Sequence, residues 1–414
     1  MSLNEAPRGV RVHIALFGKR NAGKSSIINA LTGQETAIVS EVKGTTTDPV
    51  FKSIEILPIG PCVLIDTAGM DDEGNLGELR IKKTLEVLDK TDIALLVING
   101  ETGADCEDSL IIGRIKEKKK PLIIVYNKID LINSPQDKIL SMKEEYGCPV
   151  VPVSALARQG IDELKNEIIR IMPEDEDKFK IVGDLINPGD LIVLVTPIDK
   201  AAPKGRLILP QQQVIRDILE SDAMAVVTKE HELRETLESL SRKPKLVITD
   251  SQVFLKADAD TPRDIMLTSF SILFARQKGE LSELVRGAKA VERLKDGDKV
   301  LIAEGCTHHR QSDDIGTVKI PRWIRQRTGK NIEFEFTSGS TFTDEVKKYA
   351  LIVHCGGCMM NRAGMTSRID TAKAYGVPIV NYGVLIAYIQ GILPRAIEPF
   401  PLAKLLWEEE DDIY

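Results

Sequence analysis

The chain has 414 residues, of which 43% are hydrophobic and 28% charged, and its formal net charge is −7. This composition is ordinary for a globular protein of two to four domains. No apolar run approaches the ~18 residues that a membrane helix needs, no basic stripe favours nucleic acid, and residues 1–11 lack the apolar core of a signal peptide. We therefore expect a cytoplasmic protein with no membrane partner and no nucleic-acid partner.

Residues 11–171 alternate apolar runs with amphipathic stretches, and this alternation predicts a parallel sheet with crossover helices. The expected strands are 12–17, 63–65, 93–98, 122–126 and 150–153. A charged segment that begins at Pro173 follows. We therefore assign residues 1–172 to a first α/β domain.

Two further α/β regions follow, which we assign to domains of residues 180–262 and 263–414. The expected strands are 191–195, 225–227 and 246–248 in the former, and 299–303, 331–336, 351–354 and 378–381 in the latter. A helix is expected at 264–275. The middle region carries no obvious catalytic constellation, so it is interpreted either as an assembly element or as a spacer packed on its neighbours.

A phosphate-binding loop follows the first expected strand and precedes a helical stretch that includes Ser26. It reads Gly18-Lys19-Arg20-Asn21-Ala22-Gly23-Lys24-Ser25. Glycines such as Gly23 let backbone N–H groups curl around phosphate oxygens, while Lys24 neutralises the β- and γ-phosphates and Ser25 binds Mg²⁺. If this motif were the only signal, it could also be a glycine-rich turn that arose by chance and binds no phosphate.

Three more motifs end later strands. They are Asp66-Thr67-Ala68-Gly69, Asn127-Lys128-Ile129-Asp130 and Ser154-Ala155-Leu156. Asp66 is predicted to hold Mg²⁺ through water, and the N–H of Gly69 to approach the γ-phosphate. Asp130 can accept two hydrogen bonds from guanine, a pair that adenine does not offer, and the N–H of Ala155 can reach guanine O6. Four motifs in the right order predict a GTP site.

This set resembles the GTPases of the tRNA-modification and ribosome-assembly type, over residues 11 to about 171. By that resemblance Gly44-Thr45-Thr46-Thr47-Asp48 is the first switch, with Thr46 as a second Mg²⁺ ligand. Lys24, Thr46 and Gly69 are then the catalytic residues. Met70 stands where Ras-like proteins have a water-orienting glutamine, so slow hydrolysis is expected. Asn21 matches the asparagine that binds K⁺ in potassium-activated relatives.

Three of the six cysteines gather in the third region. Cys306-Thr307-His308 is followed by 45 residues (309 to 353) and then by His354-Cys355-Gly356-Gly357-Cys358. Three thiolates with one open position are typical of a 4Fe–4S cluster with one distinct iron. A structural Cys₃His zinc site is the rival hypothesis, with His308 or His354 as its fourth ligand. Both histidines could instead only support the cysteine segments, and the spacing also leaves open that no metal binds.

The cysteine pattern behind an N-terminal GTPase resembles the FeFe-hydrogenase maturation GTPase family, commonly called HydF, over the whole chain. The resemblance implies a P-loop GTPase domain, a small α/β dimerisation domain that makes a homodimer, and an α/β iron–sulfur domain. It implies that Cys306, Cys355 and Cys358 bind a 4Fe–4S cluster. It further implies a scaffold or carrier for the two-iron precursor of the hydrogenase active site, with radical-SAM maturases and apo-FeFe-hydrogenase as partners.

Two alternatives are kept beside this hypothesis. One is a ribosome- or tRNA-directed GTPase with a structural zinc site, which the acidic net charge disfavours. The other is a redox enzyme with an all-cysteine cluster, which is disfavoured because only three cysteines lie together. The sequence leaves open the fourth cluster ligand and the step that GTP controls.

Overall fold

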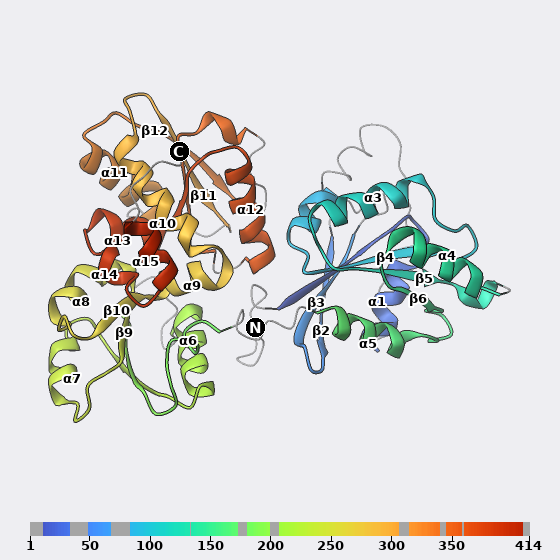
Figure 1. The fold of residues 1–414 in the computed structure, drawn as a ribbon, viewed down its shortest axis with the longest axis horizontal. Coiled ribbons are helices and arrows are strands. Elements are labelled where there is room, and N and C mark those ends of the chain that lie inside the picture. Colours follow the sequence, from blue (N-terminus) through green and yellow to red (C-terminus); the bar gives the residue numbers. More distant parts are fainter. Residues whose placement is uncertain are drawn as a thin grey trace. The chain divides into compact units, whose positions relative to one another are not determined.

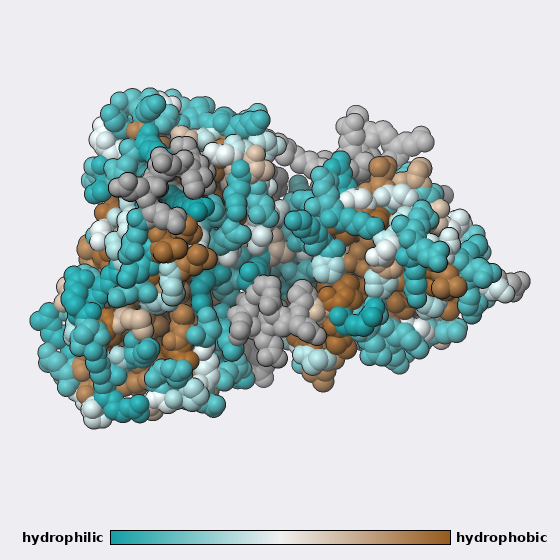
Figure 2. Space-filling model, viewed as in Figure 1, coloured by the Kyte–Doolittle hydropathy of each residue, from teal (hydrophilic) through white to brown (hydrophobic). Residues whose placement is uncertain are grey.

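The structure is a computed structural model that describes residues 11–33, 49–67, 83–132, 134–172, 180–198, 207–305, 314–339, 345–357 and 360–408. The chain divides into two compact units, Met1–Glu174 and Asp175–Tyr414, coloured blue to green and green to red in Figure 1. Hydrophilic side chains cover most of the face seen in Figure 2, with hydrophobic residues in smaller patches between them. Within these ranges no helix has the length and apolarity to cross a membrane.

Unit 1 is built on a six-stranded sheet with the order β2-β3-β1-β4-β5-β6. The strands are β1 Val12–Phe17, β2 Val50–Ile56, β3 Gly60–Asp66, β4 Ile93–Asn99, β5 Leu122–Asn127 and β6 Val150–Val153. All neighbouring pairs are parallel except β2 with β3. The five strands expected from apolar runs are confirmed. The sequence prediction missed β2, because this edge strand exposes alternate residues and has no apolar run.

Helices cover both faces of this sheet, as Figure 1 shows. They are α1 Lys24–Thr32, α3 Cys106–Glu117, α4 Gln136–Tyr146 and α5 Ile161–Ile171, together with helical residues 83–89. Helices α1 and α5 share one hydrophobic cluster with the sheet, and α3 and α4 share the other. In α5 the buried residues Ile161, Leu164 and Ile168 recur at helical spacing, so one face of this helix packs on the strands.

Unit 2 contains two four-stranded parallel sheets, with the orders β10-β9-β7-β8 and β12-β11-β13-β14. The strands of the first are β7 Leu191–Val195, β8 Met224–Thr228, β9 Leu246–Thr249 and β10 Met266–Ser269. Those of the second are β11 Lys299–Glu304, β12 Glu333–Ser338, β13 Leu351–His354 and β14 Ile379–Asn381. Every strand expected from the sequence is present, and β10 is an addition.

The helix expected at 264–275 is wrong in its first half. Residues 266–269 form β10, which pairs with β9, and α9 begins only at Phe270. The Ser269 hydroxyl accepts a hydrogen bond from the N–H of Ile272 and caps α9, which fixes where strand ends and helix begins. The first sheet of unit 2 therefore extends past residue 262. We keep the three-domain division as a proposal, with the second domain continuing at least to Ser269.

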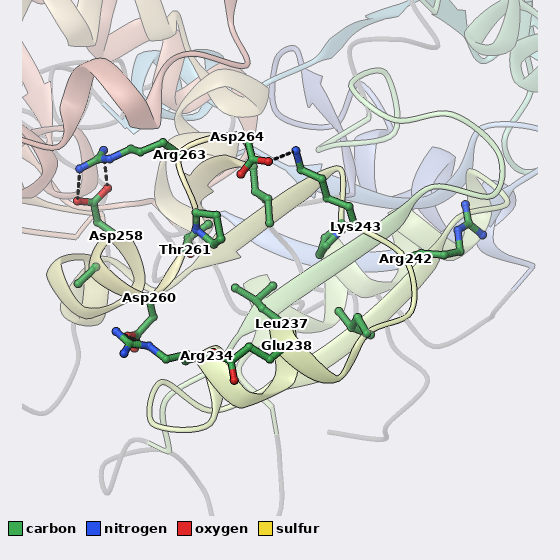
Figure 3. A pocket seen from close by; sticks show the side chains of 15 residues that line it. Arg234, Leu237, Glu238, Arg242, Lys243, Asp258, Asp260, Thr261, Arg263 and Asp264 are labelled. Carbon is green, nitrogen blue, oxygen red and sulfur yellow. Dashed lines mark hydrogen bonds and ion pairs between the residues drawn. The ribbon is translucent and has the colours of Figure 1, made fainter.

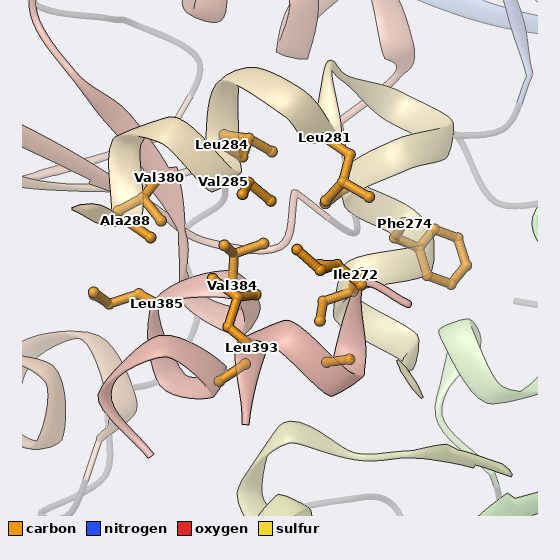
Figure 4. Packing of buried hydrophobic residues seen from close by; sticks show 14 of the residues in the cluster. Ile272, Phe274, Leu281, Leu284, Val285, Ala288, Val380, Val384, Leu385 and Leu393 are labelled. Carbon is orange, nitrogen blue, oxygen red and sulfur yellow. The ribbon is translucent and has the colours of Figure 1, made fainter. Parts of the chain in front are cut away.

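The helices of unit 2 surround both sheets. They are α6 Leu209–Glu220, α7 Leu233–Ser239, α8 Phe254–Asp260, α9 Phe270–Lys278, α10 Leu281–Lys289, α11 Ile320–Thr328, α12 Arg362–Ala374, α13 Tyr382–Ile389, α14 Leu393–Ala396 and α15 Pro401–Glu408. One continuous hydrophobic core spans the two sheets. In Figure 4, Ile272 of α9 lies beside Val384 of α13, Leu385 of α13 lies on the side of Ala288, and α10 covers them with Leu284 and Val285.

The first described residues of unit 2 are held by charged side chains. One carboxylate oxygen of Asp217, in α6, accepts hydrogen bonds from three successive N–H groups, Ile181 at 3.0 Å, Val182 at 2.7 Å and Gly183 at 2.8 Å. Arg276, in α9, donates to the carbonyl of Ile181 at 2.8 Å. Successive N–H groups around an anion form a favourable nest. The segment that follows the charged linker is therefore fixed to α6 and α9 together.

Candidate functional site

The phosphate-binding loop has a backbone that only glycine fits at two positions. Gly18 has φ +134°, and a Cβ there would lie 2.3 Å from the carbonyl oxygen of Val97. Gly23 has φ +96°, and its Cβ would lie 2.2 Å from Asn127 Nδ2. Both glycines therefore let the loop lie directly against the neighbouring strands β4 and β5.

The predicted phosphate and Mg²⁺ residues open α1 at the carboxyl edge of the sheet. The Lys24 ammonium is buried and donates to the carbonyls of Gly18 and Lys19, each at 2.8 Å. The Ser25 hydroxyl donates to Asp66 Oδ2 at 2.6 Å, although 41 residues separate them. Ser26 follows Ser25 on the exposed side of the helix. The fold thus brings the P-loop and the end of β3 into contact.

Several predicted residues lie outside the described ranges. They are Thr46 and Gly69 of the nucleotide site, and Cys306, His308 and Cys358 of the metal site. Their roles stay predictions.

The Asn127 side chain connects three of the predicted motifs. Its Nδ2 donates to the carbonyl of Ala22 in the P-loop at 2.8 Å, and its Oδ1 accepts from the N–H of Ala155 at 3.2 Å. One amide therefore joins the P-loop, the end of β5 and the loop after β6. The contact predicted between the Ala155 N–H and guanine O6 stays a prediction, because this N–H here donates to Asn127.

Among the predicted base-reading residues, Asp130 lies at the surface beside this connection, whereas Ser154 is buried. Asp130 is exposed within a short 3₁₀ turn, Ile129–Leu131. Lys128 precedes the turn in a left-handed conformation with φ +64°, and its ammonium is 3.8 Å from Glu101 Oε2. The Ser154 hydroxyl accepts from the N–H of Ala157 at 3.1 Å and closes its own loop. The Asp130 carboxylate therefore faces solvent, where a base could reach it.

A second connection of the P-loop was not predicted. The Lys19 ammonium pairs with Asp105 and, at 3.1 Å, with Glu107 Oε2. Asp105 caps α3 by accepting from the N–H groups of Glu107 and Asp108. The hydrogen bond from Lys19 lowers the pKa of Asp105 and correspondingly raises that of Lys19. The sequence signals the cap, since an acid recurs three residues later, but it does not signal its pairing with Lys19.

The described part of the metal site lies at the carboxyl ends of β11 and β13. Ala303 and His354 are paired across these parallel strands, and the N–H of Cys355 donates to the carbonyl of Ala303 at 2.9 Å. The N–H of Gly305 donates to Cys355 Sγ at 3.1 Å, across 50 residues of sequence. Among the described residues no group of three or more His, Cys, Asp and Glu side chains is arranged to hold a metal. The fold nevertheless places Cys355 beside the residue that precedes Cys306.

His354 is fully buried and both its ring nitrogens have partners. Nε2 lies 2.6 Å from Arg368 Nη1, and Nδ1 lies 2.7 Å from the carbonyl of Cys355. A guanidinium only donates, so Nε2 accepts and Nδ1–H donates. Burial, followed by the Arg368 charge, lowers the pKa of His354 to about 3, which keeps the ring neutral. This arrangement favours a supporting role for His354 over direct ligation of a metal.

A cavity of about 820 Å³ in unit 2 lies apart from the residues predicted for either site. It opens at the amino ends of β9 and β10, and its charges pair with one another, as Figure 3 shows for Lys243 with Asp264 at 2.5 Å. Arg234 pairs with Asp260 at 2.8 Å. Because these lining charges are satisfied within the chain, we assign no function to this cavity.

The Asn127 connection generates a prediction for nucleotide affinity. Asn127→Ala removes the hydrogen bonds to the P-loop and to Ala155, so we expect GTP affinity to fall about tenfold to a hundredfold. Asn99→Ala is the matched control. Asn99 lies opposite Asn127 in the pairing of β4 with β5, but its side-chain oxygen accepts from the N–H of Glu101. Titration with a fluorescent GTP analogue measures both variants. Wild-type affinity in Asn127→Ala would contradict the connection.

Family models match three parts of the chain: a 50S ribosome-binding GTPase over residues 13–128, the hydrogen maturase F dimerization domain over 181–279, and the hydrogen maturase F tetramerization domain over 282–399. The curated relatives include the GTPase Der of Mycoplasmopsis pulmonis, 34% identical over 205 residues (47% of this chain, 46% of that protein). They also include the tRNA modification GTPase MnmE of Laribacter hongkongensis, 36% identical over 159 residues (38% of this chain, 34% of that protein).

The chain thus spans less than half of the length of these two curated relatives. Among solved structures, Era of Aquifex aeolicus is matched with a TM-score of 0.37 and 22% identity, over 55% of this chain and 98% of that one. The two curated relatives are GTPases. The two hydrogen maturase F models together cover most of unit 2. The chain therefore belongs to the hydrogen maturase F family and carries a GTPase domain in its N-terminal unit.

Proposed function

We propose that this chain is a GTP-hydrolysing iron–sulfur scaffold and carrier that delivers the two-iron precursor of the FeFe-hydrogenase active site to the apo-hydrogenase. The observation that carries the proposal is the 3.1 Å hydrogen bond from the Gly305 N–H to Cys355 Sγ. It joins the two segments that hold the predicted thiolates, within a chain that also carries a GTPase domain. Radical-SAM maturases are the proposed source of the precursor.

The residues present fit a thiolate-bound cluster. Cys355 Sγ accepts a second hydrogen bond from the N–H of Gly357 at 3.4 Å, and such bonds to sulfur are among the means by which proteins tune iron–sulfur clusters. The proposed ligands are Cys306, Cys355 and Cys358. A 4Fe–4S cluster held by three thiolates would supply one iron with an exchangeable position. The zinc alternative with His354 as fourth ligand is weakened because both nitrogens of this residue are already engaged, whereas His308 stays a candidate.

The GTPase domain supports GTP hydrolysis with Mg²⁺ as the proposed cofactor. Ser25 and Asp66 already lie together, as a shared Mg²⁺ site requires. We propose that Asp130 selects guanine and that hydrolysis is slow, because Met70 cannot orient water. GTP binding or hydrolysis would then switch the contacts with the maturases or the hydrogenase.

The three cysteines are tested together by their alanine variants. Cys306→Ala, Cys355→Ala and Cys358→Ala should each lose most of the cluster and abolish hydrogenase activation, whereas GTP hydrolysis persists because its residues lie in the other unit. Iron and sulfide analysis with electron paramagnetic resonance of the reduced, anaerobically reconstituted protein measures the cluster. Cys148→Ala, a half-buried cysteine of unit 1, is the control.

Two results would contradict the three-cysteine site. One is full cluster retention in Cys306→Ala, and the other is stoichiometric zinc in anaerobically purified wild-type protein.

We also propose that K⁺ stimulates hydrolysis through Asn21. This residue is exposed in the P-loop and has a left-handed backbone with φ +60°. Wild-type hydrolysis should be faster in KCl than in NaCl at equal ionic strength, and Asn21→Ala should lose the difference. Phosphate release in the two salts measures this, and equal wild-type rates would refute the role of K⁺.

We propose that the hydrogen maturase F dimerization domain makes a homodimer through the edge strand β8. Among the described residues, β8 is the last strand at one edge of its sheet. Its residues Met224 and Val227 are 42% and 45% exposed. An edge strand offers backbone N–H and C=O groups for pairing with a second chain.

A charge at this edge should prevent pairing. Val227→Asp should shift the protein from dimer to monomer in light scattering, because a carboxylate would be buried in the interface. Leu255→Asp is the control, since Leu255 is 59% exposed on α8 away from β8. A dimer of unchanged stability in Val227→Asp would place the interface elsewhere.

A further inference from the structure

We infer that Lys278, the last residue of α9, is a positioning residue of the cysteine loop, defined by its described residues 354–357 and 360. Its buried ammonium holds the loop backbone on both sides of Cys358 in the sequence and stabilises the negative charge of a thiolate-bound cluster. The inference rests on the proposed function, because only a cluster at these cysteines brings that negative charge.

Lys278 is 4% exposed, although lysine is normally a surface residue. Its Nζ donates to the carbonyl of Gly357 at 2.9 Å and to the carbonyl of Met360 at 3.0 Å, across 79 and 82 residues of sequence. Burying an ammonium is unfavourable unless strong hydrogen bonds replace its water. The two carbonyls supply such bonds, so α9 and the cysteine loop are held to each other by a charge.

Gly357, which supplies one of the bonded carbonyls, has a backbone that favours glycine. Gly357 has φ +60°, and a Cβ there would lie 2.5 Å from Met365 Cε. The N–H of Met360 donates to the Gly357 carbonyl at 3.0 Å, so this oxygen accepts from both Met360 and Lys278. Lys278 therefore fixes the backbone of Gly357 and of Met360, the described residues that flank Cys358 in the sequence.

A second buried cation lies at the start of the loop. Arg368, from α12, donates to His354 Nε2 at 2.6 Å and to the carbonyl of Gly339 at 2.8 Å. Glu304, at the end of β11, is a buried carboxylate near the same site, with Tyr382 Oη 3.5 Å from its Oε1. A 4Fe–4S core with three thiolates is negative overall, so Lys278 and Arg368 favour its binding and its reduction, whereas Glu304 opposes them.

Lys278 is better suited to a test than Arg368, because Arg368 also sets the orientation of His354. Lys278→Met keeps the length of the side chain but removes its charge and donors. Lys278→Gln keeps N–H donors without the charge. Lys373→Met is the matched control, since Lys373 is a partly exposed lysine of α12 that pairs with Glu280 at 3.0 Å.

The variants are studied as full-length protein after anaerobic reconstitution with iron and sulfide. Cluster stability is measured as the rate of iron loss to a chelator, and the charge effect as the midpoint potential in a redox titration followed by paramagnetic resonance. Folding is checked by tryptophan fluorescence, because both tryptophans, Trp323 and Trp407, lie in unit 2.

We expect Lys278→Met to lose iron about tenfold faster than wild type, as the loss of charge-assisted hydrogen bonds implies. Its midpoint potential should become more negative, because reduction adds negative charge that the ammonium no longer stabilises. Lys278→Gln should hold iron better than Lys278→Met but share its lower potential. Lys373→Met should match wild type in both measurements.

Wild-type rates of iron loss together with a wild-type potential in Lys278→Met would overturn this inference but leave the proposed function standing. If Lys278→Met fails to fold, Lys278→Gln decides, and a wild-type potential in that variant would likewise overturn it. A wild-type protein that takes up no iron would contradict the proposed function itself, and with it this role of Lys278.

Discussion

The hydrogen bond from the Gly305 N–H to the Cys355 sulfur requires β11 and β13 to lie side by side and to run in the same direction. Parallel strands end at one edge, so the loops that follow them meet there. Unit 1 uses the same constraint, where the ends of β1, β3, β5 and β6 gather the P-loop, Asp66, Asn127 and Ala155. Both candidate sites therefore follow from strand order and direction.

Parallel strands covered on both faces were predictable from sequence, because burial on two sides produces continuous apolar runs. Strands β2 and β10 were missed for different reasons. The former lies at a sheet edge and exposes alternate residues, and the latter is short and ends in Ser269, which caps the next helix. Because β10 joins the first sheet of unit 2, that sheet extends past residue 262, and the domain boundary stays a proposal.

Contiguous motifs such as the P-loop and the Cys355–Cys358 pair carry their own pattern, so the sequence predicts them. The contacts that position these motifs have no local sequence pattern, so the sequence does not predict them. Lys19 meets Asp105 across 86 residues and Lys278 meets Gly357 across 79. Neither lysine differs in local sequence from an ordinary surface lysine, and only the fold brings its partner near.

Helix α9 connects two parts of unit 2 that the sequence treats separately. Arg276 holds the segment after the linker, and Lys278, two residues on, holds the cysteine loop. Two residues turn a helix by about 200°, so these side chains leave α9 on opposite sides. Helix α9 therefore contacts both the first described residues of unit 2 and the proposed cluster site.

In the proposed function this chain holds a cluster in which one iron differs from the other three. Mössbauer spectroscopy of wild-type protein reconstituted anaerobically with ⁵⁷Fe tests it most directly. The account predicts a 4Fe–4S spectrum in which addition of a small external ligand, such as cyanide, changes the signal of one iron in four. A spectrum in which all four irons ignore the ligand, or a protein that retains zinc and no iron, would contradict it.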